Sequence, residues 1–354
     1  MVARGPGAVG CAHCTQLGAA VPCASCKRLV CPACAADWST CEQPCSRTFK
    51  LARGERLLDV DPSGRLGLVW GAYSKLRYLE LQTPRWVDAD VPPLVQKPEL
   101  QPRLSSTGKM FQFEHGRERL SEDGLAISSV SPTAKQVVRM ELMPGDHGAQ
   151  ISERDDLYWY ITARQRVVVL RDLVQEIYEP LPKKVLSCAF VDDAHGLLAS
   201  ASWGEIMVHR MVGGALEQVC YLKTTGAVEW VAIAFPYLAS LVRGGAEDGL
   251  LLWKISSTPA YPSMLVHLAE RVRVAALSRD GRYLAAALDD HRVFVRDIEN
   301  GGNTSFDEHT APVTLMRFVG DDHQLITADE KGRVVLRTHG ESGYLREVVE
   351  VPIR

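Results

Sequence analysis

A pattern of about 40 residues recurs along most of this 354-residue chain, and it constrains the fold more than any other feature of the sequence. Each copy has an alternating strand, an Asp/Gly turn, a strand of small and apolar residues, a second Asp/Gly turn and a β-branched strand. A fourth strand then leads to the next copy. The clearest copies span residues 185–211, 228–255, 272–298 and 313–338.

Four antiparallel strands repeated at this period predict the blades of a β-propeller over residues 50–354. Residues 56–81 fit the pattern well, and residues 111–142 and 151–173 fit it more loosely, which gives seven blades. Six or eight blades stay open, because the Pro-rich stretch 88–109 is an insertion that fits no copy. The last segment, "YLREVVEVPIR", is expected to complete the last blade and to close against the blade that begins near Glu55.

These copies resemble WD40 repeats. That family ends its third strand with Trp-Asp, and here Trp253 lies in "LLLWKI" while Asp297 lies in "VFVRDI". His309 in "EHTAPVTLMRF" stands where the family has a histidine before the first strand, and Asp248 before Gly249 matches the aspartate of its tight turn. The resemblance implies a mostly β chain with a seven-bladed WD40-like propeller.

Eight of the ten cysteines fall within the first 45 residues, mostly as C-x2-C pairs. In a chain without an apolar leader, such pairs are typical of metal ligands rather than disulfides. Four pairs supply the ligands of two tetrahedral Zn²⁺ sites. The remaining two, Cys188 and Cys220, lie in apolar strand-like runs and are expected to be buried structural thiols.

The spacing favours interleaved zinc sites. Only "KRLV" separates Cys26 from Cys31, so pairing in sequence order is cramped. Interleaving gives one site of Cys11, Cys14, Cys31 and Cys34, and a second of Cys23, Cys26, Cys41 and Cys45. Closed four-cysteine sites are structural, and a segment this short needs the metal to fold. We therefore expect two structural zinc ions in a finger over residues 11–46, after a flexible stretch 1–10.

The segment "CASCKRLVCPAC" resembles the centre of cross-brace, treble-clef fingers of the FYVE, RING and PHD type. FYVE fingers that bind phosphoinositides have a basic, histidine-rich patch before the third cysteine. Here "LGAAVPC" has no charge, so phosphoinositide binding is not expected. RING fingers place a histidine among their middle ligands, whereas all eight expected ligands here are cysteines.

Composition narrows the class of partner. The net charge is −3, with no lysine-rich run, which argues against nucleic acid as a partner. No stretch of about 18 apolar residues occurs, so membrane insertion is not expected. These features predict a soluble, cytoplasmic protein with protein partners.

The GxSxG, P-loop and HExxH motifs of enzymes are all missing from the sequence. Three acidic pairs, at residues 192–193, 289–290 and 321–322, fall at expected hairpin turns, where aspartate is favoured for backbone reasons. We therefore expect no enzymatic activity.

Partners of propellers usually dock on the face lined by the turns between second and third strands. Trp203 occupies such a turn, where an exposed ring would anchor an interface and a ring packed on the neighbouring blade would not. The other candidates on this face are Glu247, Asp248, Asp290, His291, Arg292, Glu330 and Lys331.

A zinc finger and a propeller without a catalytic set predict a scaffold or adaptor that binds proteins with both modules. One alternative is a ubiquitin-ligase-like adaptor, in which the finger recruits a conjugating enzyme. Another, from resemblance to bacterial propellers, is an accessory protein of an AAA+ ATPase system.

Overall fold

All the regular structure described for this chain is β-strand. The computed structural model describes residues 9–10, 17–18, 21–22, 29–30, 46–71, 76–82, 84–87, 103–104, 110–115, 125–130, 141–142, 147–151, 157–161, 166–171, 174–181, 187–190, 195–255, 263–320, 324–340, 343–344, 348–350 and 353. No helix occurs in these residues, and therefore none that could cross a membrane. The expected class, a mostly β chain of antiparallel sheets, is confirmed.

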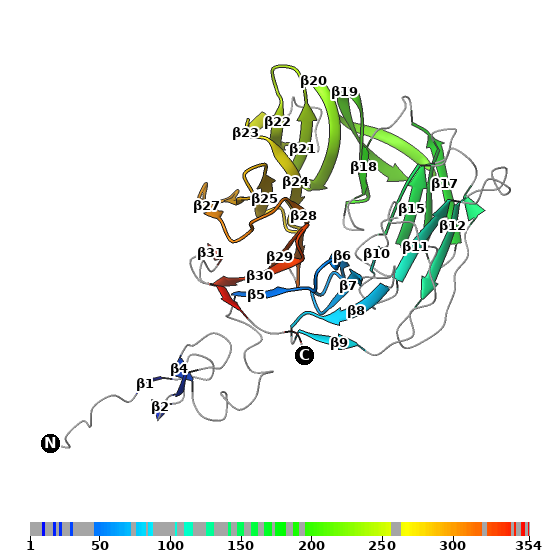
Figure 1. The fold of residues 1–354 in the computed structure, drawn as a ribbon. Helices are drawn as coiled ribbons and strands as arrows, with labels where there is room; N and C mark the ends of the chain where they lie inside the picture. The colour runs from blue at the N-terminus through cyan, green and yellow to red at the C-terminus, as the bar shows by residue number, and fades with distance from the viewer. Residues whose placement is uncertain are drawn as a thin grey trace.

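Four sheets are simple four-stranded meanders (Figure 1). The first contains β6 (Arg56–Val60), β7 (Leu66–Trp70), β8 (Leu76–Glu80) and β9 (Arg85–Val87). The second contains β10 (Arg103–Leu104), β11 (Met110–His115), β12 (Leu125–Val130) and β13 (Glu141–Leu142). The third contains β14 (His147–Ile151), β15 (Leu157–Ile161), β16 (Arg166–Arg171) and β17 (Val174–Pro180). The fourth contains β24 (Val272–Leu277), β25 (Tyr283–Leu288), β26 (Val293–Asp297) and β27 (Asn303–Phe306).

A larger sheet combines two such meanders. It contains β18 (Ser187–Phe190), β19 (Leu197–Val212), β20 (Ala215–Ala234), β21 (Tyr237–Arg243), β22 (Gly249–Lys254) and β23 (Ser263–Leu268). Strand β19 folds back on itself at Trp203 and Gly204, since Met211 N donates to Gly196 O at 2.9 Å. The first half of β20 pairs with β19, and its second half pairs with β21. The sheet therefore comprises two four-stranded units that share one long strand.

The last sheet joins the two ends of the described chain. Its order is β28 (Val313–Val319), β29 (Gln324–Asp329), β30 (Arg333–Gly340), β5 (Ser46–Lys50) and β32 (Val348–Glu350), with β31 (Gly343–Tyr344) beside β30. The expectation that the C-terminal segment completes this sheet is wrong: β5 pairs with β30, and β32 lies outside β5 and parallel to it. The sheet thus begins at Ser46, inside the range expected for the finger and before the expected boundary at residue 50.

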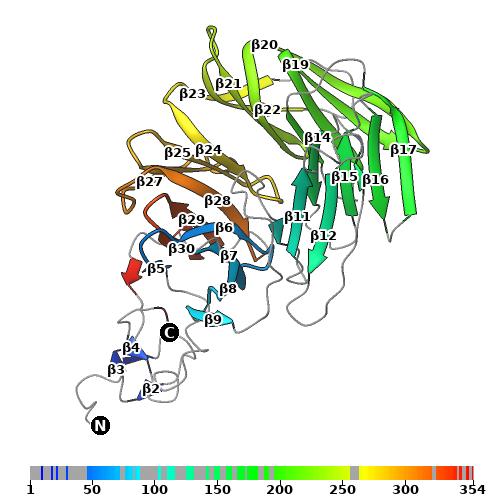
Figure 2. The ribbon, with the colours of Figure 1, turned by 45° about the vertical axis from the view of Figure 1, so that its right-hand side comes forward.

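Neighbouring sheets share hydrophobic cores, which explains their apolar strand pattern. Leu57 and Val69 of the first sheet pack in one cluster with Phe49 and Leu336 of the last. The core between β24–β27 and the last sheet has small residues such as Ala285, which is fully buried, beside the large Phe318. Figures 1 and 2 show the sheets following one another in chain order, with β6–β9 beside β28–β30. The first and last sheets are therefore neighbours.

Two short sheets lie in the N-terminal segment. They pair β1 (Val9–Gly10) with β2 (Leu17–Gly18), and β3 (Val21–Pro22) with β4 (Leu29–Val30). All eight expected zinc ligands, Cys11, Cys14, Cys23, Cys26, Cys31, Cys34, Cys41 and Cys45, lie outside the described residues.

Candidate interaction face

Turns and connectors at one end of the sheets form a continuous face, which we call the turn face. It consists of the turns between second and third strands (203–204, 243–248, 289–292 and 329–332) and the connectors between units (51–55, 224–226, 269–271 and 307–312). Backbone hydrogen bonds join the two sets: Asp289 N donates to Arg271 O at 3.0 Å, and Glu330 N donates to Pro312 O at 3.0 Å. The same end of several sheets is thereby held as one surface.

Trp203 is the most exposed large hydrophobic side chain among the described residues, at 74%. It lies at the tip of the β19 hairpin, next to Gly204, whose φ of +75° suits a tight two-residue turn. The alternative, a ring packed against the neighbouring unit, is not what the structure shows. An exposed tryptophan on a short, ordered hairpin is a typical interface anchor.

A buried carboxylate fixes the hairpin behind Trp203. Glu205 is buried, and its two carboxylate oxygens accept hydrogen bonds from Ser202 Oγ at 3.0 Å and from Tyr221 OH at 2.7 Å. These bonds tie the turn to the neighbouring half of β20. Glu205 was not predicted from the sequence, and only its place directly after an unusual Trp-Gly turn could have drawn attention to it.

Glu247 holds the longest turn against its connector. Its carboxylate accepts from Thr225 N at 3.0 Å, and its own N donates to Thr225 Oγ1 at 3.2 Å. The connector approaches so closely that a Cβ at Gly226 would lie 2.0 Å from Gly244 O, which only glycine permits. Asp248 contributes its backbone carbonyl, which accepts from His267 Nε2 at 3.1 Å.

Contacts between charged side chains hold the turn 289–292 in place. Asp290 accepts hydrogen bonds from Arg292 N at 3.1 Å and from Arg292 Nε at 2.5 Å, and Arg292 also contacts Glu270 at 3.1 Å. The hydrogen bond from the Arg292 side chain lowers the pKa of Asp290, so the carboxylate stays ionised. His291 adopts a φ of +73° at the tip.

Glu330 and Lys331 lie in the turn of the last sheet. Lys331 N donates to Asp329 Oδ1 at 2.9 Å, and its Nζ donates to Thr310 O at 3.2 Å. The structure thus brings all eight candidate residues onto the turn face, although Glu247, Asp290 and Arg292 are engaged in holding its loops.

Four of the units carry a β-bulge at the same place in their first strand. The bulged residues are Leu58, Glu229, Arg273 and Thr314. Two of them reach turn residues: Glu229 accepts from Arg243 Nε at 3.0 Å, and Arg273 Nε donates to Asp289 at 2.8 Å. Bulges commonly redirect side chains near functional sites, and here they direct charged groups toward the turn face.

A buried polar network supports the last turn from below. His309, Thr327 and Asp329 are all buried, with His309 Nδ1 3.2 Å from Asp329 Oδ2 and His309 Nε2 2.8 Å from Thr327 Oγ1. Burial opposes ionisation of Asp329, but hydrogen bonds from His309 and from the N–H groups of Arg333 and Lys331 outweigh it and lower its pKa. Of this network, the sequence singled out His309 alone.

We expect the substitution Asp329→Ala to lower the free energy of unfolding by about 2–3 kcal/mol, because three donors lose a buried acceptor. The pKa of Asp329 is lower in the folded state, so its contribution is present above the unfolded value of 3.8 and is lost as the pH falls below it. Urea unfolding of both proteins at neutral and acidic pH checks this. If the difference in free energy of unfolding between the two proteins stayed constant as the pH fell below 3.8, this prediction would be wrong.

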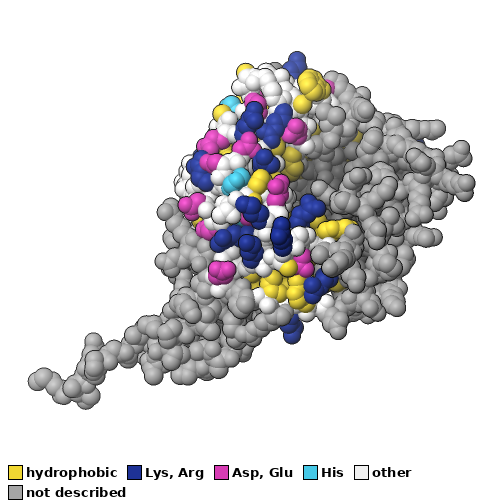
Figure 3. Space-filling view, viewed as in Figure 1, with side chains coloured by type: hydrophobic (Ala, Val, Ile, Leu, Met, Phe, Trp, Pro, Cys, Tyr) yellow, Lys and Arg dark blue, Asp and Glu magenta, His cyan; other side chains and the backbone are white. Residues whose placement is uncertain are grey.

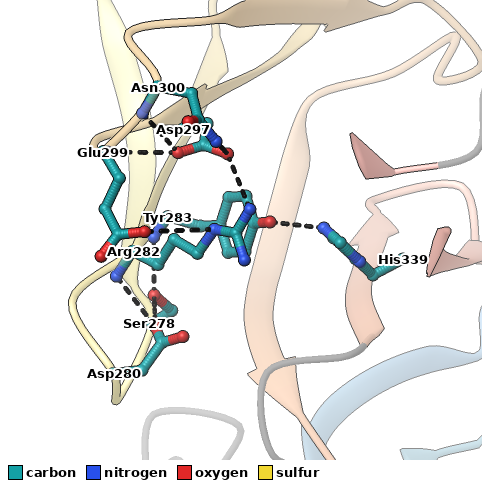
Figure 4. Close-up of polar contacts among 8 residues, drawn as sticks. All are labelled: Ser278, Asp280, Arg282, Tyr283, Asp297, Glu299, Asn300 and His339. Carbon is teal, nitrogen blue, oxygen red and sulfur yellow. Dashed lines mark hydrogen bonds and ion pairs between the residues drawn. The ribbon is translucent and has the colours of Figure 1, made fainter. Parts of the chain in front are cut away.

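The opposite end of the sheets is occupied by contacts that join two units. In Figure 4, Tyr283 OH is hydrogen-bonded to His339 Nε2, which links β25 to β30. Arg282 contacts Asp297 at 3.3 Å, and Asp280 Oδ1 accepts from Arg282 N at 2.8 Å. Burial raises the pKa of Tyr283, so its hydroxyl stays protonated and able to donate. These groups are engaged with one another, which favours a structural role.

In the part of the chain that the structure describes, no group of three or more His, Cys, Asp or Glu side chains could hold a metal ion. Cys220 is a buried free thiol, as expected, and burial raises its pKa. The side chain of Cys188 and the acidic pairs at 192–193 and 321–322 are outside the described residues.

Comparison with known proteins does not suggest a function for the turn face, so its function is inferred from its geometry. No protein-family model matches the chain, and no curated protein matches it significantly.

Proposed function

We propose that the chain is a cytoplasmic, non-catalytic scaffold that binds a protein partner through the turn face of a seven-bladed, WD40-like β-propeller. The four simple sheets, the two units of β18–β23 and the sheet of β28–β30 with β5 make seven four-stranded units in the described residues. The core shared by the first and last units supports closure of the ring.

Two partial hydrogen-bond sets support the WD40-like assignment. Trp253 Nε1 donates to Ser240 Oγ at 3.2 Å in one unit, and His309 contacts Thr327 and Asp329 in another. Together they contain the residue types of the His–Ser–Asp–Trp set that the resemblance implies, with threonine in place of serine in the second unit.

The observation that carries the binding proposal is the exposed Trp203 on a hairpin fixed by Glu205. Burying such a ring in a partner's pocket contributes about 2 kcal/mol or more to binding.

The substitution Trp203→Ala is expected to abolish capture of the main partner in a pull-down from the host while leaving stability within about 0.5 kcal/mol. Val212→Ala is the matched control, because Val212 is 47% exposed at the other end of the same strand. Equal partner recovery by both variants would refute a binding role for Trp203.

The zinc finger is part of the same proposal, and the cysteine spacing alone supports it. We expect two zinc ions per chain by elemental analysis of the purified full-length protein, one of which is lost on Cys23→Ser with Cys26→Ser. Retention of both ions by this double variant would refute Cys23 and Cys26 as zinc ligands.

A further inference from the structure

Exposed basic side chains gather where the first and last sheets meet. Figure 3 shows Lys and Arg side chains close together over the region of β28, β29 and β6. Two segments there contribute five cations, which we call the basic patch: Lys50, Arg53, Arg56, Lys331 and Arg333.

Backbone pairing holds these charges together. Lys50 of β5 is directly opposite Arg333 of β30 in the sheet register. Leu51 N donates to Gly332 O at 2.8 Å, and a Cβ at Gly332 would lie 2.9 Å from Glu55 O. The connector 51–55 and the turn 329–332 are therefore in contact, so the cations of one segment stay beside those of the other.

The described residues leave most of this charge unneutralised. The side chains of Lys50, Arg53, Arg56 and Arg333 form no ion pair or hydrogen bond within the described part of the chain, and Arg333 Nε is buried without a partner. Lys331 Nζ donates only to a backbone carbonyl. The nearest acid of the connector, Glu55, is buried and lies 3.5 Å from Arg77. Only Glu330 and Asp307 add exposed carboxylates in the adjoining loops.

Three other arginines at or beside the turn face are balanced differently, although Arg271 in the connector 269–271 forms no ion pair within the described residues. Arg243, Arg273 and Arg292 each contact a carboxylate at 3.1 Å or less. Like charges directly opposite each other on neighbouring strands destabilise a sheet, so the Lys50–Arg333 pair costs stability. An anion that lay across both segments would remove that cost.

We propose that the basic patch binds an acidic segment, rich in Asp or Glu, of the protein partner. This inference rests on the proposed function, which supplies a protein as the partner. The whole chain carries a net charge of −3, so a long polyanion such as nucleic acid would be repelled beyond the patch. A short acidic segment is attracted locally, because salt screens interactions beyond about 10 Å.

The test is fluorescence anisotropy of a labelled deca-glutamate peptide titrated with the full chain at low and physiological salt. The patch variant combines Lys50→Gln, Arg53→Gln and Lys331→Gln. The control variant removes the same charge at three exposed residues elsewhere, with Arg65→Gln, Arg210→Gln and Lys254→Gln. Urea midpoints of both variants show whether the fold is retained, and removal of the Lys50 charge is expected to leave the midpoint unchanged or slightly raised.

We expect the patch variant to bind the peptide about tenfold more weakly than the native chain at low salt, and the control variant to bind within about twofold. No binding by the native chain, or equal weakening in both variants, would overturn the proposal. Tighter binding of a single-stranded deca-thymidylate than of the peptide would overturn the assignment to an acidic protein segment. Because this assay does not involve Trp203, its failure leaves the pull-down of the Trp203 variant as a separate test.

Discussion

A chain that begins at residue 51 is expected to be far less stable than one that begins at Ser46, although they differ by five residues. Strand β5 is the fourth strand of the last sheet, and Ser46, Arg47, Thr48 and Phe49 are all buried. Thr48 Oγ1 donates to Val334 O at 3.0 Å, and Thr338 N donates to Ser46 Oγ at 3.2 Å. Loss of the strand removes these bonds and exposes the edge of β30.

The side chain of Phe49 alone gives a lower limit for the expected loss in the free energy of unfolding. Phe49 is 1% exposed in the core shared by the first and last sheets, and truncation of such a ring to alanine costs about 3–5 kcal/mol. The whole strand contributes more than this ring. Because a domain is stable by only about 5–15 kcal/mol, the shorter chain is expected to fold poorly or to aggregate.

The measurement compares chains 46–354 and 51–354 by urea unfolding, followed by tryptophan fluorescence, and by size-exclusion chromatography. In the full chain, Phe49→Ala tests the same contact without a change of length, and the exposed Lys50→Ala is its control. Equal midpoints for the two truncated chains would show that β5 does not stabilise the last sheet. The result also decides where the N-terminal segment can be removed: a cut at residue 50 would damage the last sheet, so a partner lost after that cut could not be attributed to the removed segment.

Local patterns in the sequence were sufficient to locate most of the sheets. The segments 228–255, 272–298 and 313–338 correspond to the strands from β20 to β22, β24 to β26 and β28 to β30. Alternation and turn residues determine such hairpins over short distances. The Pro-rich stretch 88–109, expected as an insertion, contains the short strand β10.

Contacts between distant parts of the chain could not be predicted in the same way. The pairing of β5 with β30 joins Thr48 to Val335, and "SRTFK" has no feature that specifies so distant a partner. Its position directly after Cys45 suggested the finger instead. The buried network of His309, Thr327 and Asp329 likewise depends on three segments that only the folded sheet brings together.

The site was predictable to a similar degree. The turn positions of Trp203, Asp290 and Lys331 follow from the repeat pattern, so the face that carries them could be identified. Which of them are available could not be predicted, because the pairing of Asp290 with Arg292 and the exposure of Trp203 depend on side-chain packing. The basic patch was missed because its two halves lie about 280 residues apart and meet only through the pairing of β5 with β30.

The contact between the first and last sheets also includes an ion pair with a buried carboxylate, and its disruption is the second large effect that we expect. Arg317 of β28 donates to Asp59 Oδ1 at 3.0 Å and to Val60 O at 2.7 Å, across the contact between the last and first sheets. The side chain of Asp59 is 0% exposed. Arg317→Met would remove this cation from a fully buried carboxylate, at an expected cost of about 3 kcal/mol in the free energy of unfolding.

A double-mutant cycle with Arg317→Met and Asp59→Asn, followed by urea unfolding, measures the coupling. The double variant is expected to be less destabilised than the sum of the single variants, because the neutral amide removes the charge that Arg317 compensates. Arg85→Met is the matched control: Arg85 contacts Glu80 at 2.8 Å in the first sheet, but its side chain is 66% exposed. An exposed ion pair contributes less than about 1 kcal/mol to the free energy of unfolding. We therefore expect Arg317→Met to lower this free energy at least about three times as much as Arg85→Met does. If Arg317→Met cost no more than Arg85→Met, the contact between the first and last sheets would have to rest on β5 and the shared apolar core alone.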